Sequence, residues 1–187
     1  MTCTLDTHIP YQIFSRSFWE KADGSPVDAF TEISATQVRE GVFKPSLAAV
    51  AVVANGNNAW LTQQCIYYCG ELEKLGKYKL TIWTEHCLLG TAGHTLVGVI
   101  EEAAYFHAYV RGSQLDFQVK GGNPLTENYS VMSPEVMMRF DGQPIPGAQK
   151  NTRLMETLVR ADVIPVAGQA LSHCVKSSVD DFLNWIL

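Results

Sequence analysis

The pattern of apolar and polar positions predicts strands that alternate with helices over most of the chain. Apolar residues recur at helical spacing, on one face of each segment, over residues 58–75, 93–110 and 151–160. Strand-like segments, which alternate or run apolar, cover residues 1–5, 79–83, 115–119 and 163–167. The helix over 58–75 is bounded by the turn dipeptide Asn55-Gly56 and by Gly76.

This alternation predicts an α/β fold of three layers, with a mostly parallel sheet and helices on both of its faces. Binding and catalytic sites in such sheets form beyond the carboxyl ends of the strands. Four predicted strand ends carry polar or reactive side chains, namely Asp6 and His8, Trp83 and His86, Lys120, and Cys174. Pro165 argues against a central position for the last strand, because proline removes a ladder donor.

Two segments fit this pattern poorly. Residues 9–46 contain Pro10, Gly24-Ser25-Pro26, Gly41 and Pro45 and show little periodicity. A connection of this length inside a compact domain usually marks a functional lid or an insertion. Residues 48–54 are small and apolar, and their pattern assigns them to no element.

Cys174 is placed where a nucleophile would be expected. The apolar run 163–167 leads through the turn 168–173 to Cys174, and apolar residues at helical spacing follow it. A thiol at a helix N-terminus is favoured as thiolate by the free N–H groups and the helix dipole. The alternative is that Cys174 is a small buried hydrophobe, as most cysteines beside an apolar helix face are.

Lys120 and Trp83 end two other predicted strands. Lys120 precedes the loop Gly121-Gly122-Asn123-Pro124, which allows the backbone to approach a ligand. Beside a thiol, a lysine lowers the thiol pKa and stabilises negative charge, whereas alone it is a solvated strand cap. Trp83 either stacks on a flat substrate or belongs to the core.

Asp6 and His8 supply a carboxylate and an imidazole two residues apart, and His86 ends a different predicted strand. Such a set suits a divalent metal ion such as zinc or iron, and the alternative for the pair is a solvated turn. The fourth ligand would be water, Gln12, Glu20 or Glu85.

Composition narrows the classes of function. The length of 187 residues fits a single domain, 1–187, with a sizeable core. A net charge of −5 without a Lys/Arg run argues against a nucleic-acid surface and favours a small-molecule partner. The five cysteines, odd in number and irregularly spaced, predict no disulfide framework, and Cys65 and Cys69 are read as structural. No secretory leader or 18-residue apolar stretch is found, so we expect a cytoplasmic protein without a membrane partner, with homo-oligomerisation left open.

Four motifs together resemble those of nicotinamidase-like enzymes among the isochorismatase-like cysteine hydrolases. Residues 83–93 resemble the family's Trp-x-x-His-Cys-x-x-Gly-Thr-x-Gly stretch, and residues 120–124 with Tyr129-Ser130 its lysine loop. Residues 168–175 resemble its nucleophile turn, and Asp6-Thr7-His8 its metal motif. The match covers nearly the whole chain in the family's order.

The resemblance implies a metal-assisted cysteine hydrolase that cleaves a carboxamide C–N bond through a thioester. Cys174 would be the nucleophile and Lys120 the activating cation. The Gln169–Ala170 peptide would be the family's cis bond, with the N–H groups of Ala170 and Cys174 as the oxyanion hole. Asp6, His8 and His86 would bind the metal, and Trp83 would line the pocket of an amide substrate.

The chain departs from the family's pattern at three places. Gln12 stands where the second metal-motif histidine is expected. Only residues 1–5 precede Asp6, so the family's first strand and its triad aspartate are expected to be missing, as are the C-terminal strand and helix. Asp6 is not expected to replace that aspartate, since it belongs to the neighbouring strand. We therefore expect poor stability and little activity from residues 1–187 alone.

Two other functions compete with the amidase. One is a catalytically impaired fragment or a non-catalytic interaction module with the same fold, favoured by the missing aspartate. The other is vinyl-ether hydrolysis of the isochorismatase type, which proceeds without the cysteine and is therefore disfavoured by Cys174.

Overall fold

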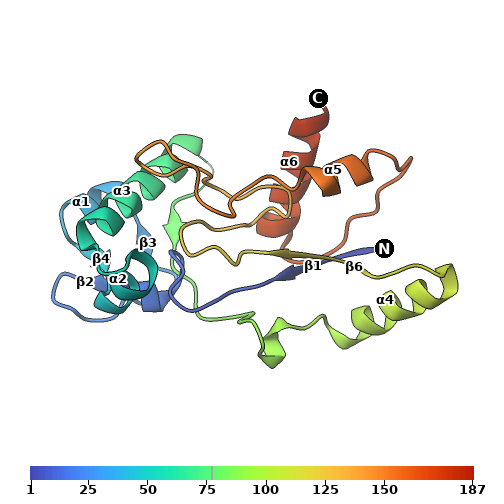
Figure 1. Cartoon of the computed structure of the whole chain (residues 1–187), viewed down its shortest axis with the longest axis horizontal. Coiled ribbons are helices and arrows are strands. Elements are labelled where there is room, and N and C mark those ends of the chain that lie inside the picture. Colours follow the sequence, from blue (N-terminus) through green and yellow to red (C-terminus); the bar gives the residue numbers. More distant parts are fainter. Residues whose placement is uncertain (77) are drawn as a thin grey trace.

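The computed structural model describes residues 1–76 and 78–187 and shows two groups of elements joined at the centre of the molecule (Figure 1). One group contains β2 (Trp19–Lys21), β3 (Glu32–Ile33), α1 (Ala35–Arg39), β4 (Phe43–Pro45), α2 (Leu47–Ala54), α3 (Asn58–Leu75) and β5 (Leu80–Thr81). The other contains β1 (Thr2–Asp6), α4 (Gly98–Arg111), β6 (Asp116–Lys120), α5 (Thr152–Leu158) and α6 (Lys176–Ile186). Short turns of 3-10 helix cover Arg16–Phe18 and Ala92–His94, and a π-helical turn covers Leu171–Val175.

The predicted three-layer fold with one mostly parallel sheet is wrong. The described strands form three separate two-stranded sheets, in the pairs β1–β6, β2–β4 and β3–β5, and only the first pair is parallel. The chain is an α/β protein, but β5 pairs antiparallel with β3. Strand β3 lies inside the segment 9–46, which was expected to be a loop. Residues 163–167 form no strand, and Val163 is 78% exposed. Pro165 offers no ladder donor, which is the physical reason that a strand fails there.

Helix α3 confirms the predicted helix over residues 58–75 at both ends. The Asn57 side chain accepts a 3.0 Å hydrogen bond from the N–H of Trp60, which satisfies one free donor of the first turn. Gly76 ends the helix with a φ of +65°, a left-handed conformation that suits glycine. Cys65 and Cys69 are buried on its inner face, and all five cysteines are free.

The main hydrophobic core surrounds the inner face of α3. Residues 13–50 contribute much of it, because α1, α2 and β4 pack against this helix and β2 packs against β4. A second, smaller cluster joins Met132 to Leu154 and Met155 of α5. The two segments that looked unstructured in the sequence, residues 9–46 and 48–54, therefore supply half of the main core. Their short elements escape detection because none exceeds eight residues.

Helix α4 stands apart from the rest of the chain (Figure 1). It begins at Gly98, five residues later than predicted, and Ala104 is its one buried residue. Phe106 is 70% exposed and Tyr109 82% exposed. This helix is therefore held by few tertiary contacts.

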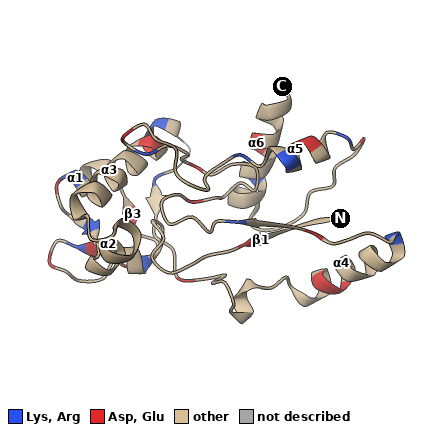
Figure 2. Ribbon diagram, viewed as in Figure 1, with Lys and Arg blue, Asp and Glu red and all other residues tan. Residues whose placement is uncertain are grey.

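Lys, Arg, Asp and Glu residues are interspersed over both groups of elements (Figure 2). Within the described residues, none of the helices has the length and apolar character needed to cross a membrane.

Candidate functional site

The parallel pairing of β1 and β6 brings Asp6 next to Lys120. These two residues are the last pair of the ladder, and Asp6 Oδ1 lies 2.5 Å from Lys120 Nζ. The sequence did not predict this ion pair, since Asp6 was assigned only to the metal motif. The last side chains of two parallel strands in register lie at the same edge of the sheet. The residue that ends β1 is therefore next to the residue that ends β6.

All three N–H donors of the Lys120 ammonium have acceptors. Besides Asp6, they are the carbonyl oxygen of Asn128 at 2.7 Å and Sγ of Cys174 at 3.7 Å. The Lys120 side chain is only 6% exposed. Burial lowers the pKa of Lys120, but the negative charges of Asp6 and Cys174 outweigh it, so the net pKa lies above the ordinary value. Lys120 is therefore a fixed cation at neutral pH.

Cys174 lies in the π-helical turn Leu171–Val175, two residues before α6 begins. The peptide bond between Gln169 and Ala170 is cis, at the position that the resemblance implies. Burial raises the pKa of the Cys174 thiol and Lys120 lowers it, with the net pKa above the ordinary value. The expected effect of Lys120 is thus present, but desolvation exceeds it in the free protein.

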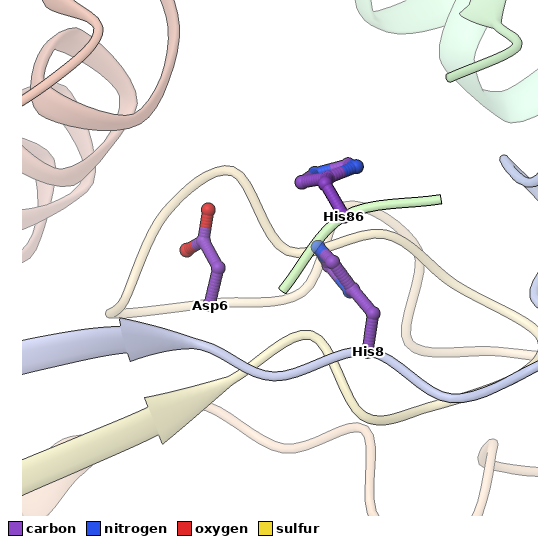
Figure 3. A group of neighbouring side chains, drawn as sticks. All are labelled: Asp6, His8 and His86. Carbon is purple, nitrogen blue, oxygen red and sulfur yellow. The ribbon is translucent and has the colours of Figure 1, made fainter. Parts of the chain in front are cut away.

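Asp6, His8 and His86 form a group that could hold a metal ion, with their ligand atoms all within 4.8 Å of one another. Asp6 and His8 come from the end of β1 and the residues after it, and His86 comes from a separate loop that faces them (Figure 3). Backbone bonds from His8 N to Cys87 O (3.0 Å) and from Leu89 N to His8 O (2.9 Å) hold that loop in place.

The hydrogen bonds of the two imidazoles fit a metal. Nδ1 of His8 lies 3.1 Å from the carbonyl oxygen of Gly121, and Nδ1 of His86 lies 2.7 Å from that of Thr84. A carbonyl only accepts, so each Nδ1 carries the proton and each Nε2 keeps its lone pair. Burial lowers the pKa of His8, which favours the neutral form that binds metals. This donor set suits a divalent metal ion.

Gln12 does not belong to the metal group. Its side chain is fully buried, its Nε2 donates to the carbonyl oxygens of Gly121 (2.5 Å) and Asn123 (2.9 Å), and its Oε1 accepts from Ile9 N (3.0 Å). It therefore supports the same Gly121 carbonyl that orients His8. Glu20 is paired with Lys44 at 3.3 Å, and Glu85 lies beside His86 but outside the three-residue group.

Gly121 allows the close approach of the His8 ring. Its φ is +86°, and a Cβ at this position would lie 2.8 Å from Cε1 of His8. The glycine that follows Lys120 in the sequence is thus required both by its backbone conformation and by its neighbour.

A pocket of about 270 Å³ opens between these groups. It brings together all the predicted site residues, namely Asp6, His8, Trp83, His86, Lys120, Gln169, Ala170 and Cys174. The four groups of side chains that were expected at strand ends therefore converge on one pocket, although they do not belong to one sheet.

One wall of the pocket is aromatic. Nε1 of Trp83 donates to the hydroxyl of Tyr129 at 3.0 Å, which fixes both rings. The His173 ring lies 6.0 Å from Trp83 and 5.5 Å from Tyr129 between ring centroids. His173 thus faces the aromatic wall and extends it.

Glu127 is an ionisable lining residue that the sequence did not predict. It is buried, and its neighbours in the loop after β6 gave no periodicity or motif that would single it out. Burial raises the pKa of its carboxyl to about 7, while the N–H of Asn128 and the charge of Lys120 act in the opposite direction. Only the fold places this carboxyl in the pocket.

Comparison with models of known protein families, with curated proteins and with solved structures gave no match for this chain.

Proposed function

We propose that this chain is a metal-assisted cysteine amidase that cleaves a carboxamide C–N bond through a thioester. The observation that carries the proposal is the position of Lys120 Nζ, between Asp6 Oδ1 and Cys174 Sγ in the same pocket as His8 and His86. A buried cation in contact with a thiol stabilises the thiolate as it forms.

In the proposed reaction, Cys174 Sγ attacks the carbonyl carbon of the amide and the charge moves to the carbonyl oxygen. The N–H groups of Ala170 and Cys174, by resemblance to the family, would stabilise that oxyanion. The C–N bond then breaks, the amine leaves, and water hydrolyses the thioester. Asp6, His8 and His86 would hold a zinc or iron ion, whose chemistry is to polarise a bound oxygen or nitrogen of the substrate.

The aromatic wall favours an amide on a planar ring. Trp83, Tyr129 and His173 present ring faces and edges to the pocket, and its volume of about 270 Å³ suits a small molecule. Nicotinamide and benzamide are therefore suitable probes. The cytoplasmic location stays a prediction from the sequence.

The test is ammonia release from nicotinamide and benzamide by the whole chain, with and without added Zn²⁺. We expect the wild type to release ammonia. We expect Cys174→Ala to release no more ammonia than a solution of Zn²⁺ and amide without protein. Cys87→Ala is the matched control, because Cys87 is also half-buried but does not line the pocket. Equal rates for wild type and Cys174→Ala would contradict the proposal.

A non-catalytic module is the second candidate, and the raised pKa of the Cys174 thiol favours it. A thiol that is neutral at pH 7 is a weak nucleophile unless a base removes its proton. If neither amide is hydrolysed and Cys174 forms no acyl adduct, the second candidate holds.

A further inference from the structure

Glu127 is a buried carboxyl in the pocket wall that the proposed reaction leaves without a role. It is 6% exposed and is fixed on both its backbone and its side chain. Its N–H donates to the Tyr68 hydroxyl at 3.1 Å, its carbonyl accepts from Glu135 N at 2.9 Å, and its Oε1 accepts from Asn128 N at 2.8 Å. A carboxyl held in this way lies in a defined position in the wall of the pocket that Lys120 and Cys174 also line.

The proton of the Cys174 thiol needs an acceptor, and Lys120 is not one. Its ammonium donates to Asp6, Asn128 and Cys174, so no lone pair is available. Asp6 is committed as well, with Oδ1 on Lys120 and a place in the candidate metal group.

Glu127 differs from Asp6 in its electrostatic surroundings. Among the described residues, no cationic nitrogen forms an ion pair with its carboxylate, whereas Asp6 contacts Lys120 directly. The charge of Glu127 raises the pKa of both Lys120 and Cys174, so the three groups sense one another across the pocket. A buried carboxylate without an ion pair is a suitable proton acceptor.

We propose that Glu127 is the proton acceptor of this site, taking the Cys174 proton through a water molecule in the pocket and returning it to the leaving amine. The inference rests on the proposed amidase function and adds the base that this function lacks. The pocket has room for the bridging water, and transfer through one water is a recognised geometry for a general base.

The proton and electron pairs balance over one cycle. The Glu127 carboxylate takes the thiol proton, the S–C bond forms, and the carbonyl π pair moves to oxygen. The oxyanion then reforms the C=O bond, the C–N bond breaks, and the nitrogen takes the proton from Glu127, giving an amine and a thioester. In the second half, Glu127 takes a proton from water, hydroxide attacks the thioester, the C–S bond breaks, and the thiolate recovers the proton.

Several titratable groups interact electrostatically with Glu127. They are Asp6 of β1, Lys120 of β6, Tyr68 of α3, Tyr129 and Glu135 of the loop after β6, and Cys174. The tyrosines have raised pKa values and stay neutral at pH 7, and Lys120 stays charged. The variant Glu135→Gln removes a neighbouring carboxylate without touching the pocket, and therefore serves as the control.

The first readout is the pH dependence of iodoacetamide alkylation at Cys174 in the whole chain, followed by peptide mass spectrometry. Ionisation of Glu127 raises the pKa of Cys174. The plot of alkylation rate against pH should therefore bend near pH 7, where Glu127 titrates, well below the pH at which the Cys174 thiol itself ionises. Glu127→Gln keeps an oxygen for Asn128 N but does not titrate, so its profile should lack that bend. Glu135→Gln should keep it.

The second readout is kcat/KM for nicotinamide as a function of pH. We expect Glu127→Gln to lose about 100-fold or more, with the acidic limb of the profile removed. A Cys174-dependent amidase whose rate and pH profile are unchanged in Glu127→Gln would overturn this inference and leave the proposed function standing. Absence of amidase activity in the whole chain would contradict the proposed function. The proton-acceptor role would then fall with it, and the alkylation bend would report only the coupling of Glu127 to Cys174.

Discussion

Asp6 and Lys120 lie opposite each other as the last pair of the parallel β1–β6 ladder, with Asp6 Oδ1 2.5 Å from Lys120 Nζ. Both strands end at this pair, so the two side chains meet where the backbone turns away. The carboxylate fixes an ammonium that also contacts Cys174 Sγ at 3.7 Å. A carboxylate, a lysine and a thiol are thus connected in series, on residues that are 114 and 54 positions apart in the chain.

Replacement of Lys120 by methionine should shift the titration of Cys174 to higher pH. Lys120 is the group that lowers the pKa of this thiol, and methionine keeps most of the side-chain volume without the charge. We expect the rate of iodoacetamide alkylation at pH 7.5 to fall by about an order of magnitude, because a smaller fraction of the thiol is ionised without the neighbouring cation. Lys176→Met, which removes an exposed cation two residues from Cys174, is the control and should leave the rate unchanged.

Glu127→Gln should change how the stability of the protein depends on pH. The ordinary pKa of the Glu127 carboxyl is 4.5, and burial raises it to about 7 in the folded state. The folded chain therefore binds the proton more tightly, and its stability falls as the pH rises from 4.5 to 7. The variant lacks this loss. The difference in free energy of unfolding between Glu127→Gln and the wild type should therefore change by about 3 kcal/mol in favour of the variant as the pH rises from 4.5 to 7.

Urea unfolding at several pH values measures this difference, and other titrating groups cancel between the two proteins. Below pH 4.5 and above pH 7 the difference should be constant. A difference that does not change between pH 4.5 and 7 would mean that the Glu127 carboxyl is solvated in the folded state.

Gly121→Ala should weaken metal binding through His8. A Cβ at Gly121 would lie 2.8 Å from Cε1 of His8, so the ring must move away from the position that faces Asp6 and His86. Loss of such support for a histidine ligand typically costs 10- to 100-fold in affinity. Titration calorimetry with Zn²⁺ would measure the effect.

Gly142→Ala is the matched control for this experiment. Gly142 has a similar backbone conformation, with a φ of +78°, but a Cβ there would meet nothing within 4 Å. Gly142→Ala should therefore lower the free energy of unfolding, because alanine disfavours a positive φ, without changing the affinity for Zn²⁺. Equal losses of affinity in the two variants would show that the His8 contact is irrelevant to the metal.

Helix α4 should exchange its amide hydrogens much faster than α3. Ala104 is the one buried residue of α4, whereas α3 buries six residues against the main core. Local opening requires little free energy where few apolar contacts are broken. Hydrogen exchange followed by mass spectrometry would test this, and equal protection of the two helices would show that α4 is covered in solution.

The residues that the sequence singled out line one pocket, whereas the fold predicted from the sequence was wrong. Helix α3 was predicted correctly because it is long and bounded by the turn dipeptide Asn55-Gly56 and by Gly76. The prediction of a single parallel sheet was wrong, because strand pairing is non-local and a strand as short as β3 carries no periodicity. The run at 163–167 looked like a strand, but Pro165 and its exposure explain why it is irregular.

The roles within the site depend on register and burial, which the sequence does not contain. Asp6 was recognised as a carboxylate of the metal motif, but its contact with Lys120 follows from the pairing of β1 with β6. Gln12 was a candidate for the fourth metal ligand, and only the structure shows that its amide donates to backbone carbonyls. Glu127 has no sequence signal, because its significance comes from desolvation.

The most direct test of the proposed amidase is acid quenching of the Zn²⁺-supplemented chain during its reaction with nicotinamide, followed by peptide mass spectrometry. We predict a peptide containing Cys174 that carries the mass of the nicotinoyl group, with no adduct on Cys87 and none in Cys174→Ala. Release of ammonia without any acyl group on Cys174, or with an equal yield in Cys174→Ala, would contradict a thioester mechanism at this residue.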